Sequence, residues 1–400
     1  MNIKISTFRS VLHDRDDFNE RSLAFIDSVA KEVGEEIKLA PLDDYDCDLK
    51  LIFIETGGSE GLFLKNFDKL KGPYYFLTSG ENNSLAATLE ILAFLASKGL
   101  IGEAIHGSLP YMASRIKELA SISITKTASE IKKKLSTIRL GVIGTPSDWL
   151  ISSIPDYDEV KRKLGITLEN ISLEEVERYY SYATGEGTGF FCDTPFSNLE
   201  LRKAKKVYSA IKTILETREL NGFTIRCFDL LNTLKTTSCL GLSLLNDAGY
   251  ISSCEGDIAA MLSMTIASMV GDGYSFQCNP SRIDIENNTI VFAHCTIPTR
   301  MLDHYKLDTH FESGIGVAIK GYLKETDVTI FRLSSDLKRY FVSNGKIIEN
   351  LDEKGLCRTQ IKVRLDEDVD SILKTPCGNH HIVFYGKHKD EIDALMNELL

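Results

Sequence analysis

Apolar runs of strand length alternate with amphipathic segments along the first third of the chain. Residues 49–54 and 74–78 are such runs, and residues 85–95 have the apolar spacing of a helix that follows the capping residues Asn83 and Ser84. Strands and helices in alternation are typical of α/β domains with a parallel sheet. We therefore expect an α/β domain at the N-terminus.

A second α/β domain is expected to follow the first. Residues 126–134 form a basic, polar stretch and residues 139–144 are a new strand-like run, so the first domain is predicted to span residues 1–137. Helical periodicity with one charged face extends over residues 199–220. We place the second domain at residues 138–274.

The pattern changes after residue 274 to short, β-rich runs, which indicates an antiparallel β domain over residues 275–400. Asn344-Gly345 separates two of these runs. Because Asn-Gly favours the positive φ angles of a type I′ turn, we expect a hairpin there. The expected strands cover residues 289–292, 316–323, 327–333, 338–342, 346–349, 359–363 and 381–385.

Charge and composition exclude several classes of partner. With 43% apolar and 26% charged residues, the chain of 400 residues has the composition of an ordinary globular protein. Its formal net charge of −11 disfavours binding to nucleic acid or to an anionic membrane. We find neither the apolar stretch of a secretory signal nor a run long enough to span a membrane. These features predict a cytoplasmic protein with no nucleic-acid or membrane partner.

The nine cysteines form no CxxC pair and no zinc-finger spacing, so reduced and mostly buried thiols are expected. The motifs of P-loop hydrolases, nucleophile-elbow hydrolases, zincins and EF-hands are all absent from the sequence. Gly141-Val-Ile-Gly144 does not complete a dinucleotide-binding motif. The chemistry must therefore come from other residues.

Two carboxylates occur where a predicted strand ends and an apolar helix begins. Glu255 and Asp257 lie between residues 250–253 and the apolar run 258–264. Carboxylates at such a junction face the mouth of an α/β domain, where ligands usually bind. Asp is also a favoured helix cap, and the spacing leaves both roles open for Asp257.

Six of the eight histidines lie in the last 107 residues, within the predicted β domain. His380 and His381 precede a strand, and alternation along the strand sends them to opposite faces, so that one of them can point into a pocket. A surface or hydrogen-bonding role is the alternative. His294 lies in an apolar strand, where a histidine buried in the core is the default.

Several segments of the sequence resemble the L-fucose isomerase-like proteins, relatives of the L-fucose and L-arabinose isomerases. Stretches around residues 83–87 and 141–151 are also similar to this group, so the resemblance covers nearly the whole chain. The segments that carry it are Cys254-Glu-Gly-Asp257, Phe292-Ala-His-Cys-Thr-Ile-Pro298, Cys357-Arg-Thr-Gln360, Gly378-Asn-His380-His381 and Tyr385-Gly386.

The resemblance implies two N-terminal α/β domains of Rossmann-like or flavodoxin-like type and a C-terminal antiparallel β domain. It also implies a divalent cation, commonly Mn²⁺ with Mg²⁺ or Co²⁺ as alternatives, bound by two carboxylates and one histidine. Asp257 and His380 match two of these ligands, and Asp229 is our candidate for the first carboxylate. The related enzymes have Glu at that position, so Asp229 departs from their pattern.

The implied activity is the interconversion of an aldose and a ketose through an enediol. The cation would polarise the carbonyl, while Asp229 and Asp257 would act as general base and acid. Glu255 would contact the substrate or the ligands, and Asn379 would orient the loop of His380. A hydride shift is not excluded by these residues.

The resemblance further implies a homo-oligomer, a trimer or hexamer, whose active site lies at a subunit interface. Asn83, Ser84 and Trp149 would then lie near the sugar, although core or interface packing is an equal alternative for Trp149. Two other functions remain open. One is a cytoplasmic sugar-binding or regulatory protein on the same scaffold, and the other is an isomerase of an acidic or sulfonated sugar.

Overall fold

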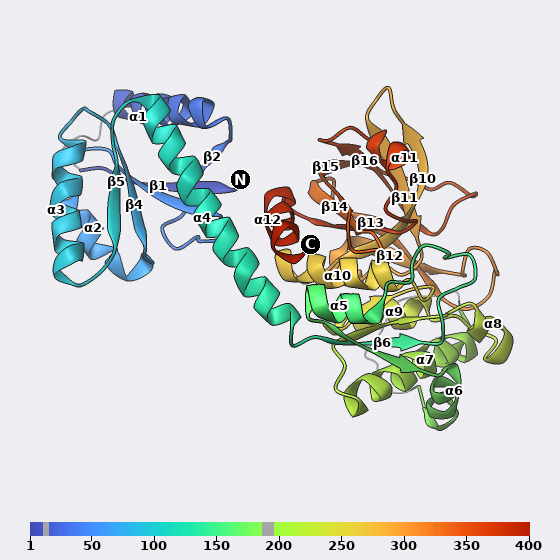
Figure 1. Cartoon of the computed structure of the whole chain (residues 1–400). Coiled ribbons are helices and arrows are strands. Elements are labelled where there is room, and N and C mark those ends of the chain that lie inside the picture. Colours follow the sequence, from blue (N-terminus) through green and yellow to red (C-terminus); the bar gives the residue numbers. More distant parts are fainter. Residues whose placement is uncertain (11–15, 186–195) are drawn as a thin grey trace. The chain divides into compact units, whose positions relative to one another are not determined.

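The computed structural model describes residues 1–10, 16–185 and 196–400, so that Cys192 lies outside the described residues. The chain separates into two compact units, residues 1–127 and residues 128–400 (Figure 1). We describe each unit by itself. The division into three domains at residues 137 and 274 stays a prediction.

Unit 1 is a five-stranded parallel sheet in the order β2-β1-β3-β4-β5. Helices α1 and α4 cover one face of this sheet, and α2 and α3 cover the other. All six residues of β3 are buried, as expected for a strand covered on both faces. The elements are β1 (Ile3–Phe8), α1 (Asp16–Val33), β2 (Ile37–Leu39), β3 (Leu49–Ile54), α2 (Glu60–Lys65), β4 (Tyr74–Thr78), α3 (Ser84–Ser97), β5 (Gly102–Ile105) and α4 (Leu109–Leu135), whose residues from 128 onward belong to unit 2.

Unit 2 begins with a four-stranded parallel sheet in the order β7-β6-β8-β9. The carboxyl ends of β8 and β9, which are neighbours in this sheet, lead into the loops that carry the candidate site. Its elements are β6 (Arg139–Ile143), α5 (Tyr157–Leu164), β7 (Thr167–Ile171), α6 (Leu173–Tyr182), α7 (Asn198–Thr217), β8 (Gly222–Ile225), α8 (Asp229–Thr233), α9 (Cys239–Asp247), β9 (Ile251–Ser253) and α10 (Ile258–Val270).

The rest of unit 2 is a closed antiparallel barrel in the order β10-β11-β16-β15-β14-β17, with a separate hairpin of β12 and β13. The expected combination of parallel α/β sheets with an antiparallel β part is thus confirmed. The elements are β10 (Phe276–Asp284), β11 (Thr289–His294), β12 (Leu302–Asp308), β13 (Ala318–Leu323), β14 (Asp327–Leu333), β15 (Tyr340–Asn350), β16 (Thr359–Leu365), α11 (Ser371–Lys374), β17 (His381–Tyr385) and α12 (Lys389–Leu399).

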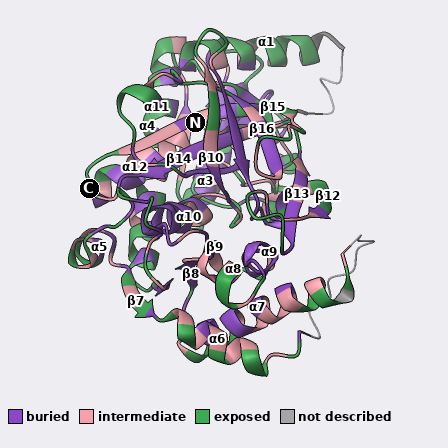
Figure 2. Ribbon diagram, turned by 90° about the vertical axis from the view of Figure 1, so that its right-hand side faces the viewer, coloured by how far each residue is buried: buried purple, intermediate pink, exposed green. Residues whose placement is uncertain are grey.

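Helix α10 joins the parallel sheet to the barrel. Its first ten residues, 258–267, are all buried (Figure 2). Seven of these ten side chains belong to one apolar cluster that also contains residues of β6, β14, β17 and α12. A helix that is apolar all round is stable only when it is covered on every side. The start of α10 is therefore held between the two halves of unit 2.

The predicted hairpin at Asn344-Gly345 is wrong, because both residues lie inside the continuous strand β15. They pair with Thr329 and Val328 of β14. A Cβ atom on Gly345 would lie 2.5 Å from the carbonyl oxygen of Arg364, so glycine is needed here for the close approach of β16. Glycine is favoured both where strands approach closely and in tight turns, so the local sequence does not distinguish these two causes.

Two other expectations can be compared directly with the structure. No helix of the described residues is long and apolar enough to span a membrane. Every cysteine of the described ranges is a free thiol, and all but two of these thiols are buried. The exceptions are the partly buried Cys47 and Cys357.

The crowding at Gly345 leads to a stability prediction. Gly345→Ala is expected to lower the free energy of unfolding by about 1 to 3 kcal/mol, since β15 and β16 must move apart. Gly355→Ala is the matched control, because a Cβ atom there meets nothing within 4 Å. Urea denaturation measures both variants. Equal stability of the two would contradict the strand assignment.

Candidate metal site

The turn between β9 and α10 presents two carboxylates at the end of the parallel sheet. Glu255 and Gly256 have φ angles of 63° and 72°, so the chain turns sharply at these two residues. A Cβ atom on Gly256 would lie 2.7 Å from the Cα atom of Pro146, which leaves room only for glycine. Asp257, the next residue, directly precedes α10.

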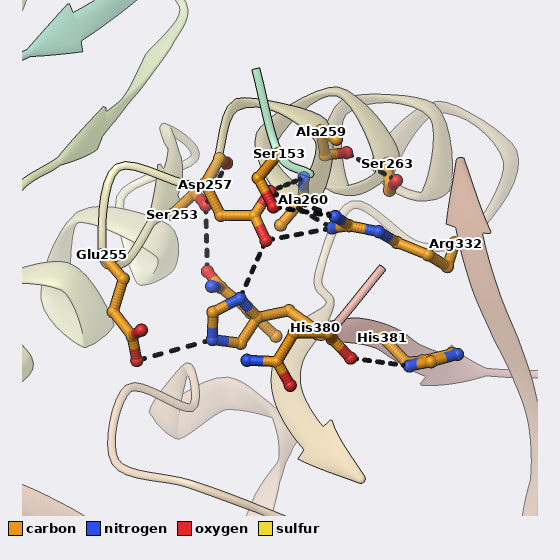
Figure 3. Close-up of polar contacts among 12 residues, drawn as sticks. Ser153, Ser253, Glu255, Asp257, Ala259, Ala260, Ser263, Arg332, His380 and His381 are labelled. Carbon is orange, nitrogen blue, oxygen red and sulfur yellow. Dashed lines mark hydrogen bonds and ion pairs between the residues drawn. The ribbon is translucent and has the colours of Figure 1, made fainter. Parts of the chain in front are cut away.

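The Asp257 carboxylate is fully buried and accepts hydrogen bonds at both oxygens (Figure 3). Its Oδ1 atom caps α10 by accepting from the backbone nitrogen of Ala260 at 2.7 Å. Arg332, also fully buried, donates from Nη1 to Oδ2 at 3.2 Å. Burial alone would raise the pKa of Asp257, but the charges of Arg332 and His380 outweigh it and lower this pKa to about 2. Asp257 is thus held as an anion.

His380 lies directly before β17, where the Asp257 carboxylate fixes its orientation. The Nδ1 atom is 2.9 Å from Oδ2 of Asp257, so Nδ1 carries a proton and donates it to this carboxylate. The Nε2 atom is buried and has no hydrogen-bond partner among the described residues. Burial opposes a charge on this ring, but Glu255 and Asp257 raise the pKa of His380 to about 9.

Two imidazole rings lie close to one carboxylate oxygen of Glu255. Its Oε1 atom lies 3.5 Å from Nε2 of His380 and 3.6 Å from Nε2 of His294. The other ring nitrogen of His294 is 3.0 Å from the hydroxyl oxygen of Thr296. The potential ligand atoms of Glu255, His294 and His380 all lie within 4.8 Å of one another.

This group has the properties of a cation site. Three buried ligand atoms converge, and the Nε2 atom of His380 makes no hydrogen bond within the described residues; its one charged neighbour, Oε1 of Glu255, is 3.5 Å away. A carboxylate and two imidazoles are common ligands of divalent transition metals. The hydrogen bond from Nδ1 of His380 to Asp257 is the outer contact that orients a ligating histidine. The residues present therefore fit a metal ion.

A pocket of about 410 Å³ opens beside Glu255. The indole nitrogen of Trp149 donates to Oε2 of Glu255 at 2.8 Å, and its ring packs edge-on against Phe228 with ring centres 4.9 Å apart. Three of the residues expected from the sequence, Trp149, Glu255 and Asn379, thus line one pocket. The remaining lining residues are Phe228, Asn279 and Glu312.

Asp229 is the first residue of α8 and lies outside the group of converging ligand atoms. Its carboxylate is 45% exposed and binds Nε of Arg226 at 3.0 Å. The same guanidinium also holds Asp148, at 2.9 Å. Arg226 therefore links Asp229 and Asp148, each of which is the chain neighbour of a pocket aromatic.

Asn83 and Ser84 lie in unit 1, at the start of α3. Asn83 has a left-handed backbone with φ of 58° and makes no side-chain cap. Ser84 is fully buried, donates its hydroxyl to the carbonyl oxygen of Ile54 and accepts from the backbone nitrogen of Ser79 at 3.1 Å. The Ser84 hydroxyl thus holds two strand ends of unit 1 together.

Two residues of this centre, His294 and Arg332, were not predicted from the sequence. His294 was expected to be a core histidine, and its apolar surroundings are indeed those of a core strand. Arg332 interrupts an apolar run in β14, and a charge inside a buried strand was a usable signal. His381 points away from the metal group. Burial and then Arg332 lower its pKa to about 3, and its ring lies against Phe292.

Comparison with known proteins supports a link to sugar isomerases. No family model matches the chain. It is 26% identical over 298 residues to the sulfoquinovose isomerases of Priestia megaterium and Priestia aryabhattai. It is 27% identical over 297 residues to that of Clostridium sp. strain MSTE9. The matches cover 67% to 68% of this chain but only 65% of each relative.

The Asp257–Arg332 contact leads to a stability prediction. Arg332→Met leaves the buried carboxylate without its cation and is expected to lower the free energy of unfolding by about 3 to 5 kcal/mol. Adding Asp257→Asn should restore part of that loss, because the unpaired charge is removed. Urea denaturation measures both changes.

Arg162→Ala is the control for this prediction. It removes an ion pair whose guanidinium is 63% exposed, so no measurable change in the free energy of unfolding is expected. If Arg332→Met costs no more than Arg162→Ala, Asp257 does not depend on its buried cation.

Proposed function

We propose that this protein is a metal-dependent isomerase that interconverts an aldose and a ketose. The observation that carries the proposal is the buried group of Glu255, His294 and His380 beside a pocket lined by Trp149 and Asn379. The similarity to sulfoquinovose isomerases supports a sugar isomerase. A homo-oligomer and a cytoplasmic location remain predictions.

Three ligands from the chain leave coordination positions open, as a catalytic rather than structural metal requires. The mixed oxygen and nitrogen set suits Mn²⁺ or Co²⁺ better than Mg²⁺, which prefers oxygen ligands alone. When bound, such an ion polarises the sugar carbonyl and stabilises the enediolate. We propose Glu255, His294 and His380 as its ligands.

The role that we propose for Asp257 differs from that of a direct ligand. Both of its oxygens already accept hydrogen bonds, from Ala260, Arg332 and His380. We assign it to orienting His380: its contact with Nδ1 points Nε2 toward Glu255, where Nε2 can bind a cation once it has lost its own proton. Asp257 then acts through His380 without contacting the sugar.

Proton transfer between the two sugar carbons needs a group that takes up and releases a proton. We propose Glu312, which lines the pocket, and Asp229, the chain neighbour of the lining residue Phe228, for this step. Burial and the nearby charge of Glu255 raise the pKa of Glu312. That shift brings a carboxyl group closer to the range in which it exchanges protons near neutral pH.

The choice of sugar is a separate part of the proposal. The relatives' name favours a sulfonated sugar, whereas the six residues that line the pocket include two carboxylates and neither Lys nor Arg. Both sulfonated and uncharged sugars therefore belong in the first substrate panel.

The direct test of the activity is product formation on this panel, with and without EDTA and added Mn²⁺. We expect turnover of at least one aldose, its loss in EDTA and its return with Mn²⁺. Bound metal with no turnover of any sugar would instead favour a sugar-binding or regulatory protein.

Metal binding is tested by titration calorimetry with Mn²⁺. His294→Ala and Glu255→Gln each remove a ligand and are expected to weaken binding by at least about 100-fold. Asp257→Asn should weaken it by about 10- to 100-fold by releasing His380.

His304→Ala provides the matched control for metal binding, since His304 is exposed and stacks on Tyr322 in the β12–β13 hairpin. It should bind Mn²⁺ as the unchanged protein does. Asp229→Asn distinguishes the two ligand sets. Normal binding by His294→Ala together with lost binding by Asp229→Asn would contradict the proposed ligands.

A further inference from the structure

Two buried thiols lie in contact next to the candidate metal site. The sulfur atoms of Cys227 and Cys254 lie 3.2 Å apart, and both residues are buried, with 7% and 3% of their surfaces exposed. Cys227 directly precedes Phe228, and Cys254 directly precedes Glu255. Each thiol is therefore one residue away from a side chain that lines the pocket.

The two cysteines lie on neighbouring loops of the same sheet edge. Cys227 follows β8 and Cys254 follows β9, and these strands pair in parallel up to Thr224 and Ser253. A disulfide bond is about 2.05 Å long, so the sulfur atoms would have to approach by about 1 Å. Closing this gap requires the two loops to move toward each other.

We propose that Cys227 and Cys254 form an oxidisable pair whose disulfide weakens metal binding at Glu255. A hydroperoxide is the oxidant. The sulfur of Cys227, the more exposed of the two, attacks a peroxide oxygen, and the O–O bond breaks to give a sulfenic acid and water. The sulfur of Cys254 then displaces the hydroxyl group, which leaves as a second water. Two thiols are oxidised and one hydrogen peroxide is reduced.

This order of events agrees with the surroundings of Cys254. Cys254 is the less exposed of the two thiols. Its backbone is also fixed, because its nitrogen donates to Oε1 of Gln277 at 2.8 Å. Cys254 is therefore placed to react with the sulfenic acid of Cys227 and not to meet the peroxide first.

The disulfide would strain the turn that carries Glu255. Residues 255 and 256 have positive φ angles, and Gly256 packs closely against Pro146. The backbone of this turn therefore has little room to change its conformation. A displacement of Cys254 therefore also displaces Glu255. The Oε1 atom of Glu255 must stay near two imidazoles to bind a cation. The effect on the metal rests on the proposed function, whereas the formation of the disulfide does not.

The experiment treats the metal-free full chain with hydrogen peroxide, blocks the remaining thiols with iodoacetamide and maps disulfides by peptide mass spectrometry. Mn²⁺ affinity is measured in parallel. We expect a Cys227–Cys254 disulfide and a fall in Mn²⁺ affinity of about 10- to 100-fold that dithiothreitol reverses.

Two serine variants complete the design. Cys227→Ser should bind Mn²⁺ normally when reduced and keep its affinity after peroxide. Cys47→Ser, which alters a partly buried thiol of unit 1, should respond as the unchanged protein does.

Three results would overturn the proposal. They are the absence of this disulfide, a disulfide with unchanged affinity, and an equal loss of affinity in Cys227→Ser. A reduced protein that binds no Mn²⁺ would count against the proposed function instead, and the mass spectra would still report whether the disulfide forms.

Discussion

The candidate site depends on the buried contact of Asp257 with Arg332 and His380. A carboxylate removed from water is unstable unless charged or polar donors surround it. Arg332 supplies the opposite charge, Ala260 the helix-capping nitrogen and His380 the third donor. One side chain thereby starts α10, neutralises the only fully buried guanidinium of the described residues and orients the imidazole that faces Glu255.

The contact of Asp257 with Arg332 and His380 also joins the parallel sheet of unit 2 to its antiparallel barrel. Glu255 and Asp257 come from the parallel sheet, whereas His294, Arg332 and His380 come from the antiparallel barrel. The halves meet along α10, which is apolar on every side. Gly378 belongs to the same junction, since a Cβ atom there would lie 2.5 Å from the Arg332 guanidinium. The geometry of the proposed metal ligands is therefore a product of tertiary packing.

The order of strands and helices could be predicted well, because hydrophobic periodicity is a local signal. Strands β3, β4, β14 and β17 occupy the predicted residues. Local signals failed where one residue type serves two purposes. Gly345 suits a turn and also a crowded strand pair, and only the position of β16 decides between them. For Asp257 the structure shows the capping role, because the residue caps α10, and it adds a contact with His380 that the spacing did not indicate.

The residues of the site were harder to predict because they converge from distant parts of the chain. His294 and Glu255 are 39 positions apart, and nothing near His294 in the sequence distinguishes a ligand from a core histidine. The measurement that tests the account most directly is anomalous diffraction from crystals grown with Mn²⁺. The account predicts one peak at bonding distance, about 2.0 to 2.3 Å, from Glu255, His294 and His380. A peak bonded to the oxygens of Asp257 and Asp229 would contradict it.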